Sequence, residues 1–597
     1  MKKEVLLKRE VFYTLLLALV FSFHPLFTHA IPAPPYIYEL SQPDGSTFMA
    51  KRWGDEFCKG WETVGGYTIV FNEDTGFWEY AILGEEGELK PSTVSVKVGD
   101  SEALEHSKRL RPTKRNFVRE VPSSAKNRIL TGKSLTGEGK MPVVLMNFAD
   151  RNYKYSRQQF TQSWFGSGSS SRTLKKYYEE VSNGNFTVSP GSSGIVGWYR
   201  ALNGHDYYGA NQSGIDYRIG EFIKEAAQQA DRNMNFSEYD QDGDGEVDIF
   251  IVVFQGTGEH ESGNEYDIWP HQFSLDGLAM YDLPGGGKYM TQEGVYVNSY
   301  LVVNEVGIYG DFSPIGVIAH EYGHALGLPD LYDTDYSSMG VGDWSLMASG
   351  SYGEVAYPGD CPLHLDAWSK FLLGWIQPVE ISLGSSQNIT LSPVETGGNV
   401  YKIGTGNTLS GEYFLVENRQ KIGFDAPLPT SGLCIWHIDG DLIKKRFSNN
   451  SVNNRECVIE KAEEISCCSR EHFGVSLEQA DGKFDLEIGT NTGDSGDLFP
   501  GSTNKTSFKD STTPSSLFYG CKRSWLSITE IVISSSNIQA IFTYEKKSTN
   551  PNVDDDDEEG CGKSNKDDRD IGKHLLDIAL AGVTLILLTG LVGRVKS

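Results

Sequence analysis

Residues 313–327 constrain the fold of this chain more than any other segment, because they combine helix-boundary signals with two regularly spaced histidines. Ser313 is a favourable N-cap, Pro314 suits the first helical position, and Gly327 suits the residue beyond the helix end. A helix of roughly three to four turns is therefore predicted. His320 and His324 lie one turn apart on this helix, so both imidazoles project from the same face.

Two imidazole nitrogens on one helix face can hold a zinc ion, and Glu321 would then lie beside the metal-bound water as general base. The bare pattern His-Glu-x-x-His arises by chance in roughly one or two of 100 chains of this kind. This chain continues the pattern to Gly327 and Asp330, which lowers the chance to about one in 10,000. Gly327 can adopt a left-handed conformation that turns the chain back, so Asp330 is predicted as the third zinc ligand.

Two residues downstream are candidates for supporting roles at this metal. Met347 lies in a turn-rich segment and is similar to the Met-turn that underlies the zinc ion of metzincins. Tyr352 is a candidate for oxyanion support, although a packed or solvent-facing tyrosine fits the same sequence.

A second cation site is predicted in residues 240–248, where carboxylates recur at alternate positions and glycine stands at the sixth. Such loops wrap oxygen ligands around a hard cation, so calcium is favoured. The loop departs from a complete EF-hand because its twelfth position is Ile251 rather than Glu, and solvated turn residues are the alternative interpretation. The candidate ligands are Asp240, Asp242, Asp244, Glu246 and Asp248.

The charge of the chain is strongly acidic, with a formal net charge of −27, and it is unevenly distributed. Nucleic acid is excluded as a partner because phosphate binding needs a basic face. Between residues 233 and 369 there are 23 acids and one basic residue, Lys288. This interval contains both predicted metal sites, so its acidity indicates provision for cations and, as a hypothesis, faster capture of basic substrates.

The N-terminal third of the chain divides into three parts. Residues 1–30 have the layout of a secretory signal, with a membrane anchor as the alternative. Residues 31–107 alternate like short strands between turns and are predicted to form a small β-rich propeptide. Residues 108–133 contain nine Lys or Arg and one acid, which indicates a processing site for an activating protease; a solvated linker is the alternative. Cys58 is a candidate thiolate that caps the zinc of the zymogen.

The middle of the chain contains two regions of different secondary structure. Residues 134–378 mix buried-strand runs, such as 141–148 and 249–254, with helical periodicity at 174–181 and 220–230, which is typical of an α/β domain. In residues 379–550 the helical signals fade and strand-like stretches predominate, so a β-rich, sandwich-like domain is expected.

The C-terminal segments predict attachment to a membrane. Residues 551–573 form an acidic, self-repelling stalk, residues 574–593 are predicted as a single transmembrane helix, and residues 594–597 as a cytoplasmic tail. A lipid-anchor signal that is removed is the alternative, as is release of the protein. The predicted location is therefore the secretory pathway and the cell surface, with the N-terminal part outside the cell.

Glycosylation and disulfides would fit an exported chain. Disulfides are expected among the cysteines of the exported part, with no pairing predicted; the candidates are Cys361, Cys434, Cys457, Cys467, Cys468 and Cys521. Six sequons are candidate glycosylation sites, namely Asn185, Asn211, Asn235, Asn388, Asn449 and Asn504.

These motifs together resemble the M6, or immune inhibitor A-like, metalloproteases over most of residues 36–545. The resemblance rests on residues 42–45, 54–56, 177–184, 240–248, 256–259, 320–333, 344–347, 432–439 and 477–482. It implies a multidomain protein with an α/β metzincin-like zinc protease domain, structural calcium, a propeptide that is removed and a β-rich domain after the catalytic one. It also implies that His320 and His324 bind zinc, that Glu321 is the catalytic base and that Met347 forms the Met-turn. A C-terminal membrane anchor departs from the usual secreted pattern.

The function predicted from the sequence is zinc-dependent cleavage of proteins or peptides by an exported zymogen. A membrane-anchored binding or adhesion ectodomain that keeps the metalloprotease fold without turnover is the alternative, and the intact Glu321 argues against it. A peptidase of small peptides is a third interpretation.

Overall fold

A computed structural model describes residues 29–56, 58–85, 87–100, 108–112, 133–168, 172–212, 215–454 and 473–545. Most of the predicted signal, the linker from 113 to 132 and Cys457, Cys467 and Cys468 lie outside the described residues. The same is true of the acidic stalk, the predicted transmembrane helix and the tail. In the described ranges, no helix combines the length and apolarity needed to span a bilayer.

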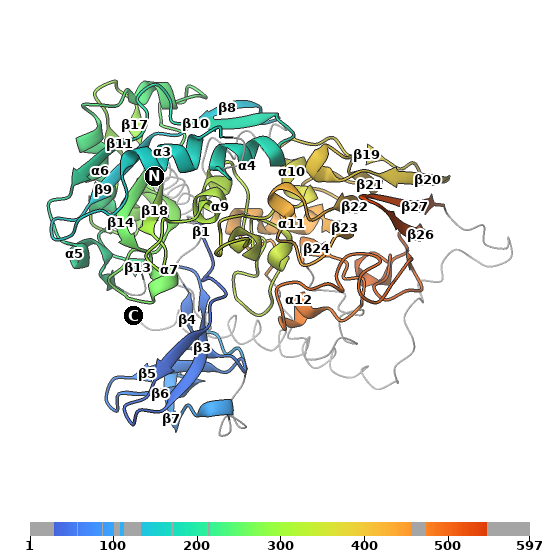
Figure 1. Ribbon diagram of the computed structural model, residues 1–597, viewed down its shortest axis with the longest axis horizontal. Helices are drawn as coiled ribbons and strands as arrows, with labels where there is room; N and C mark the ends of the chain where they lie inside the picture. Colours follow the sequence, from blue (N-terminus) through green and yellow to red (C-terminus); the bar gives the residue numbers. More distant parts are fainter. Residues whose placement is uncertain are drawn as a thin grey trace, which may run out of the picture. The chain divides into compact units, whose positions relative to one another are not determined.

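A mixed six-stranded sheet organises the region from 134 to 378, in the order β1-β15-β18-β14-β9-β11 (Figure 1). The predicted buried strand is β9 (Val143–Asn147), which pairs in parallel with both neighbours. β14 also pairs in parallel with β18, whereas β15 is antiparallel to β18 and β1 is antiparallel to β15. The other strands are β1 (His29–Ala30), β11 (Val196–Arg200), β14 (Phe250–Thr257), β15 (His271–Ser274) and β18 (Ser299–Val306).

Helices cover both faces of this sheet, because its strand residues alternate between two cores. Val143 and Leu145 of β9 belong to the core that includes α4 and α9, whereas Val144 and Met146 belong to the core that includes α6. The periodicity predicted α4 and α6 to within one residue. The helices are α3 (Arg157–Phe165), α4 (Leu174–Val181), α5 (His205–Gly209), α6 (Ile219–Ala230), α7 (Glu259–Ser262), α8 (Leu275–Met280), α9 (Ile315–Ala325) and α10 (Ala367–Leu372). Short strand pairs are β8 (Gly137–Lys140) with β10 (Phe186–Ser189), β12 (Asn211–Gln212) with β13 (Ile215–Asp216), and β16 (Tyr289–Met290) with β17 (Tyr296–Val297).

The helix α9 begins one residue later than the capping signals predict. Pro314 is the N-cap, with extended backbone angles of φ −68° and ψ 158°, and no side chain caps the helix. The backbone N–H of Gly316 donates instead to Gly359 O at 3.0 Å. Ser313 is therefore not needed as a cap, because a tertiary contact satisfies a donor of the first turn. The predicted end of the helix is confirmed, since Gly327 adopts φ 92°.

Residues upstream of 134 form the expected β-rich unit, a six-stranded antiparallel meander. Phe48, Ile69 and Tyr80 form the centre of its core. The unit extends beyond the predicted boundary at 107, because Arg111 pairs with Glu62 at 2.8 Å. The strands are β2 (Tyr38–Ser41), β3 (Thr47–Gly54), β4 (Lys59–Thr63), β5 (Thr68–Asn72), β6 (Phe77–Leu83) and β7 (Leu89–Ser95).

The region after 378 contains two β-sheets, as its strand-like stretches predict. Residues from both, such as Phe414 and Ile435 of one and Ile528 and Phe542 of the other, belong to one hydrophobic cluster. The five-stranded sheet has the order β19-β21-β22-β23-β24 and the four-stranded sheet β20-β27-β26-β25. The elements are β19 (Val379–Glu380), β20 (Ser385–Leu391), β21 (Tyr401–Gly404), β22 (Glu412–Arg419), β23 (Gly432–Asp439), α11 (Gly440–Arg446), β24 (Val475–Leu477), α12 (Asp485–Ile488), β25 (Phe508–Lys509), β26 (Leu526–Ser534) and β27 (Asn537–Tyr544).

The predicted boundary at 378/379 marks a change of secondary structure but not a gap in the packing. One continuous core contains Val317 and Met347 from the upstream region and Leu415 and Trp436 from the downstream region. The two regions therefore share this hydrophobic core, and neither buries the apolar surface of this cluster without the other.

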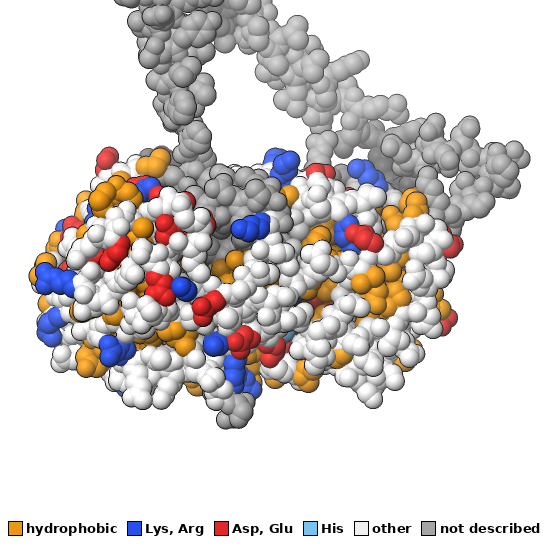
Figure 2. Space-filling view, turned by 90° about the horizontal axis from the view of Figure 1, so that it is seen from above, with side chains coloured by type: hydrophobic (Ala, Val, Ile, Leu, Met, Phe, Trp, Pro, Cys, Tyr) orange, Lys and Arg blue, Asp and Glu red, His pale blue; other side chains and the backbone are white. Residues whose placement is uncertain are grey.

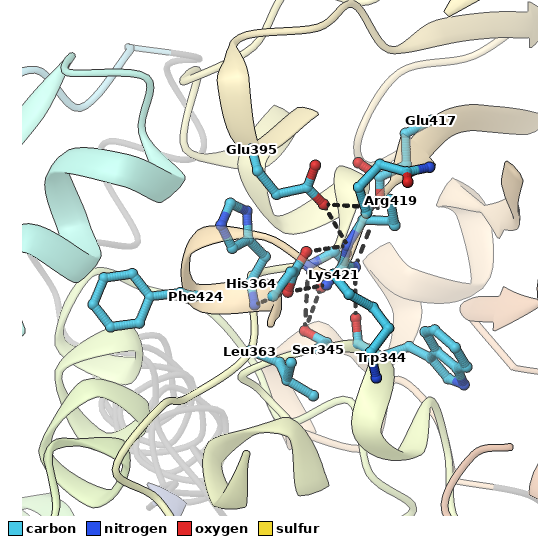
Figure 3. A network of polar contacts seen from close by, with 12 residues as sticks. Trp344, Ser345, Leu363, His364, Glu395, Glu417, Arg419, Lys421 and Phe424 are labelled. Carbon is cyan, nitrogen blue, oxygen red and sulfur yellow. Dashed lines mark hydrogen bonds and ion pairs between the residues drawn. The ribbon is translucent and has the colours of Figure 1, made fainter. Parts of the chain in front are cut away.

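A buried ionic network reinforces this shared core (Figure 3). The guanidinium of Arg419, which is 0% exposed, donates to both oxygens of Asp425 at 2.6 and 2.7 Å and to Trp344 O at 3.0 Å. Asp425 also accepts from the backbone N–H of His364 at 2.9 Å. Burial raises the pKa of Asp425, but the Arg419 guanidinium outweighs that effect and holds the pKa below its usual range. Arg419 thus connects the β-rich region to the turn that precedes Met347.

Part of the acidity of residues 233–369 is internal. Glu259, Glu305, Asp330 and Asp366 are each at most 1% exposed. On the face drawn in Figure 2, acidic and basic side chains are interspersed. The net charge of this region therefore reflects buried carboxylates that need partners as well as a solvated surface.

Arg419→Met should destabilise the protein by about 3–5 kcal/mol, because it leaves Asp425 as an uncompensated buried charge. The measurement is the free energy of unfolding from urea denaturation followed by tryptophan fluorescence. Lys444→Met, on the exposed side of α11, is the control and should change stability by less than about 0.5 kcal/mol. Equal stability of the two variants would contradict the structural role of Arg419.

Candidate metal centre

The two histidines of α9 are fixed by backbone acceptors. His320 Nδ1 lies 2.8 Å from Leu346 O, and His324 Nδ1 lies 2.8 Å from Leu328 O. Because a carbonyl oxygen only accepts, each Nδ1 carries the proton and each Nε2 keeps its lone pair. The two Nε2 atoms are 3.1 Å apart. Burial lowers the pKa of His324, which favours the neutral form that binds metals.

Asp330 completes a triangle of candidate ligand atoms with these histidines. Its Oδ1 lies 3.2 Å from the Nε2 of His320 and 3.2 Å from that of His324. All three residues are 0% exposed. The left-handed Gly327 turns the chain after the helix, as predicted, and its N–H donates to His324 O at 2.8 Å.

The residues fit a zinc ion. Ligands held at ~2.0–2.1 Å in a tetrahedral arrangement lie roughly 3.3 Å apart, close to the edges of this triangle. The donor set of two neutral imidazoles and one carboxylate is also one that zinc prefers. Each imidazole has the outer hydrogen bond that orients metal-bound histidines.

Met347, the predicted Met-turn residue, packs against the helix that carries both histidines. It is fully buried, and its backbone oxygen accepts from Leu331 N–H at 2.8 Å. A Cβ atom added to Gly323 would lie 2.7 Å from the sulfur of Met347, so the thioether packs directly against α9 between the two histidines. Only glycine permits this approach.

Asn450 is a site residue that sequence reasoning missed. Its side-chain oxygen accepts from the Asp330 backbone N–H at 2.7 Å, and its amide nitrogen donates to Asp330 Oδ2. Asn453 and Asn454 bind the same loop, through Leu331 O at 2.9 Å and the Thr334 hydroxyl at 2.6 Å. These asparagines stand 120 residues further along the chain, in the β-rich region, so no local pattern connects them to the metal motif.

The chain just upstream of the meander occupies the space in front of Glu321. β1 lies beside the edge strand β15, with Ala30 opposite His271. The backbone N–H of Ile31 donates to Glu321 Oε1 at 2.6 Å, and Ile31 O accepts from Trp269 Nε1 at 3.1 Å. Glu321 therefore contacts an extended backbone next to the three candidate ligands.

Comparison with known proteins supports a protease domain in this region. Residues 146–376 match the family model described as the immune inhibitor A peptidase M6 catalytic domain. The chain is 32% identical over 246 residues to the pre-pro-metalloprotease PrtV of Vibrio cholerae serotype O1 (strain M66-2), covering 35% of this chain and 25% of that protein. It is 29% identical over 296 residues to immune inhibitor A of Bacillus thuringiensis subsp. alesti, covering 41% of each.

The matched segment, residues 146–376, is similar to the catalytic domain of the M6 peptidases. The resemblance expected from the motifs is thus confirmed for the segment that contains both histidines, Glu321 and Met347. The chain spans less than half the length of the two curated relatives, with 25% and 41% of them aligned.

Two other residues are expected to act at this site. The hydroxyl of Tyr352 donates to Pro32 O at 2.6 Å, so in the described chain it holds the backbone that follows Ile31, and its oxyanion role stays a prediction. Cys58 is buried, but the cluster of candidate ligands consists of His320, His324 and Asp330 and does not include it.

The second predicted cation site is formed in part. Asp240, Asp242 and Asp244 offer oxygens that all lie within 4.8 Å of one another. Burial, followed by the negative charge of Asp242, raises the pKa of Asp248 to about 7, and this carboxylate is not among the three that converge. The carboxylate of Glu246 pairs with Lys288 and accepts from Asn298 Nδ2 at 2.9 Å, and its role as a calcium ligand stays a prediction.

The structure bears differently on the predicted modification sites. Cys361 and Cys434 are free, buried thiols, so the expected disulfides do not involve these two.

Asn211 is half-buried and its amide nitrogen donates to Glu259 Oε2 at 3.1 Å, a bond with which a glycan would compete. The five other sequon asparagines are exposed, namely Asn185, Asn235, Asn388, Asn449 and Asn504.

Asn450→Ala should weaken zinc binding by about 10–100-fold, because Asp330 loses the partner that fixes its orientation. The measurement is the zinc dissociation constant from competition with a chromogenic chelator. The neighbouring Asn449→Ala, at an exposed position, is the matched control in protein made without glycosylation. Identical affinities for the two variants would contradict an orienting role for Asn450.

Proposed function

We propose that this protein is a zinc-dependent endopeptidase that hydrolyses peptide bonds of proteins. The observation that carries the proposal is the position of the Ala30–Ile31 peptide bond. Its nitrogen lies 2.6 Å from Glu321 Oε1, beside the triangle of His320, His324 and Asp330, and its chain is paired antiparallel with an edge strand as an extended substrate would be. Similarity to the catalytic domain of the M6 peptidases and the metalloprotease names of both relatives support the same function.

The roles of the residues follow from this arrangement. A zinc ion held by His320, His324 and Asp330 would polarise the scissile carbonyl and lower the pKa of a bound water. Glu321 takes the proton of that water and delivers it to the leaving amine, whose position Ile31 N marks. Trp269 Nε1 donates to the carbonyl of Ile31, and the Tyr352 hydroxyl donates to the carbonyl of Pro32. Both therefore align the backbone that follows the scissile bond.

Glu321→Gln should lower the rate of peptide hydrolysis at least about 100-fold while one zinc ion per chain remains bound, because the proton acceptor is lost but the ligands are not. The measurements are cleavage of a protein substrate with and without a chelator, and metal content by mass spectrometry. Glu354→Gln, an exposed carboxylate, is the control. Turnover at the normal rate in Glu321→Gln would refute the assignment, and an inactive natural protein would favour the binding or adhesion alternative.

We also propose that the protein is made as a zymogen. Residues 31–33 occupy the front of the site, and Ala33 N–H donates to Gly54 O at 2.7 Å, which connects this segment to the meander. Cleavage of a signal after Ala30 would make Ile31 the first residue, with its amino group beside Glu321. One relative is named a pre-pro-metalloprotease, which supports a removable propeptide.

We propose that an activating protease cuts the basic linker, residues 108–133. Cleavage by trypsin should raise activity about 100-fold, because a tethered strand competes with substrate at an effective concentration of about millimolar. The measurement is hydrolysis of a quenched peptide against time, with loss of the N-terminal fragment followed by size-exclusion chromatography.

The matched control replaces the basic residues of the linker by glutamine and should remain intact and silent. The replaced residues are Lys114, Arg115, Arg119, Lys126, Arg128 and Lys133. Full activity in this uncut variant would contradict the zymogen.

A structural calcium ion is the second cation that we propose. The convergence of Asp240, Asp242 and Asp244 supports it, because unscreened carboxylates at this spacing repel one another. Asp248 is the fourth candidate ligand.

Export and membrane attachment complete the proposal. The layout of residues 1–30 and the exposure of five sequon asparagines support passage through the secretory pathway. The apolar run at 574–593 supports anchoring at the cell surface as a single-pass protein, with a lipid anchor or release as the alternatives.

A further inference from the structure

A buried carboxylate on α7 is paired only with groups that lie outside the helix. Glu259, whose side chain is 2% exposed, lies 2.5 Å from Lys59 Nζ and 3.7 Å from an Arg52 nitrogen. Asn211 Nδ2 donates to the same carboxylate at 3.1 Å. Both cations belong to the N-terminal meander, which the zymogen proposal removes from the active enzyme.

The ring of Trp269 connects this carboxylate to the substrate position. Its face lies 5.1 Å from Lys59 Nζ and 5.4 Å from the Arg52 guanidinium carbon. Its Nε1 donates at 3.1 Å to Ile31 O, the carbonyl that follows the nitrogen bound by Glu321. The Trp269 ring therefore contacts both the cations that pair with Glu259 and the backbone on the leaving-amine side of the cleavage position.

The surroundings can also hold the aliphatic part of a long side chain. Glu56 and Lys59 of the meander line a cavity together with Asp216 and Trp269, and its other walls are mostly apolar, among them Ile219 and Leu278. Glu259 is not a wall of this cavity, but it pairs with Lys59, which is. Aliphatic stems of Lys and Arg bury well against such walls while the charged end reaches a carboxylate.

Loss of the meander removes both cations that pair with Glu259 in the described chain. Asp216, which is 6% exposed, accepts from the Trp269 backbone N–H at 3.1 Å, and burial raises the pKa of its carboxyl well above the usual range, so Glu259 is the carboxylate that carries the charge here. Lys288 is the only Lys or Arg between residues 233 and 369, and it is engaged by Glu246 and Asp276. Glu259 then lacks the ion pairs that it makes in the precursor, so a substrate cation that restores them is bound favourably.

We propose that, in the processed enzyme, Glu259 and Trp269 form a subsite on the leaving-amine side that binds a Lys or Arg side chain of the substrate. This rests on the proposed function and specifies its substrate class. In the precursor, Lys59 and Arg52 fill the subsite from within the same chain. The cation stacks on the indole and pairs with the carboxylate, a combination that discriminates against neutral side chains.

The test uses the processed enzyme and quenched peptides that differ at one position after the scissile bond, with Lys in one and the neutral norleucine in the other. For one of the first three such positions, kcat/KM should be at least about tenfold higher for the Lys peptide. Glu259→Gln should bring the Lys/norleucine ratio to within about twofold of unity. Glu354→Gln, an exposed carboxylate outside the subsite, should leave the ratio at the natural value.

The outcomes separate this inference from the proposed function. If the natural enzyme cleaves both peptides equally at all three positions, the subsite is refuted while the endopeptidase function stands. If neither peptide nor any protein is cleaved, the proposed function itself fails. If Glu259→Gln does not fold or mature, the natural enzyme still decides, because a Lys preference that falls as salt rises from 0.05 to 0.5 M supports the subsite and its absence refutes it.

Discussion

Three buried ligand atoms brought within 3.2 Å of one another are the constraint around which this protein is built. Burying two imidazoles and a carboxylate at 0% exposure is unfavourable unless a cation or hydrogen bonds satisfy them. The surrounding residues must therefore hold the three ligand atoms in an orientation that one cation can bind. Carbonyl acceptors fix both histidines, Met347 packs against the helix that carries them, and Asn450 holds the far oxygen of Asp330. A cluster of this kind depends on its outer hydrogen bonds nearly as much as on its ligands.

The supports come from both sides of the change in secondary structure at 378/379. Arg419 donates to the carbonyl of Trp344, next to the Met-turn, and Asn450 reaches the loop that presents Asp330. A catalytic part cut at residue 378 would lose these contacts and part of the shared core. The β-rich region is therefore needed to form the site, as are the sheet and helices of the segment that matches M6. The family match ends at 376, whereas the physical unit that shapes the site extends beyond it.

Electrostatics also relates the N-terminal meander to the site. An acidic region with Lys288 as its single basic residue would repel itself if its buried carboxylates lacked partners. The meander supplies such partners at Glu259, and the strand before it brings the Ile31 N–H to Glu321. Latency and substrate preference, as proposed, would depend on the same contacts. The cations that pair with Glu259 in the precursor have the charge that a substrate side chain needs to replace them after the meander is released.

The sequence by itself determined what local periodicity encodes. It predicted α9 and its glycine-ended turn, the buried strand β9, the helices α4 and α6, and the spacing that brings His320 and His324 to one face, because these depend on 3.6- and two-residue repeats within a short window. It could not predict that Pro314 caps α9, that Glu246 turns to Lys288, or that Asn450 and Ile31 meet the site from 120 and 290 residues away. No local sequence pattern predicts those contacts, because they join residues that are distant in the sequence. They form only when separate elements pack into one core and each buried polar group makes a hydrogen bond there. Tertiary structure alone decided which residues surround the metal site and which strand lies across it.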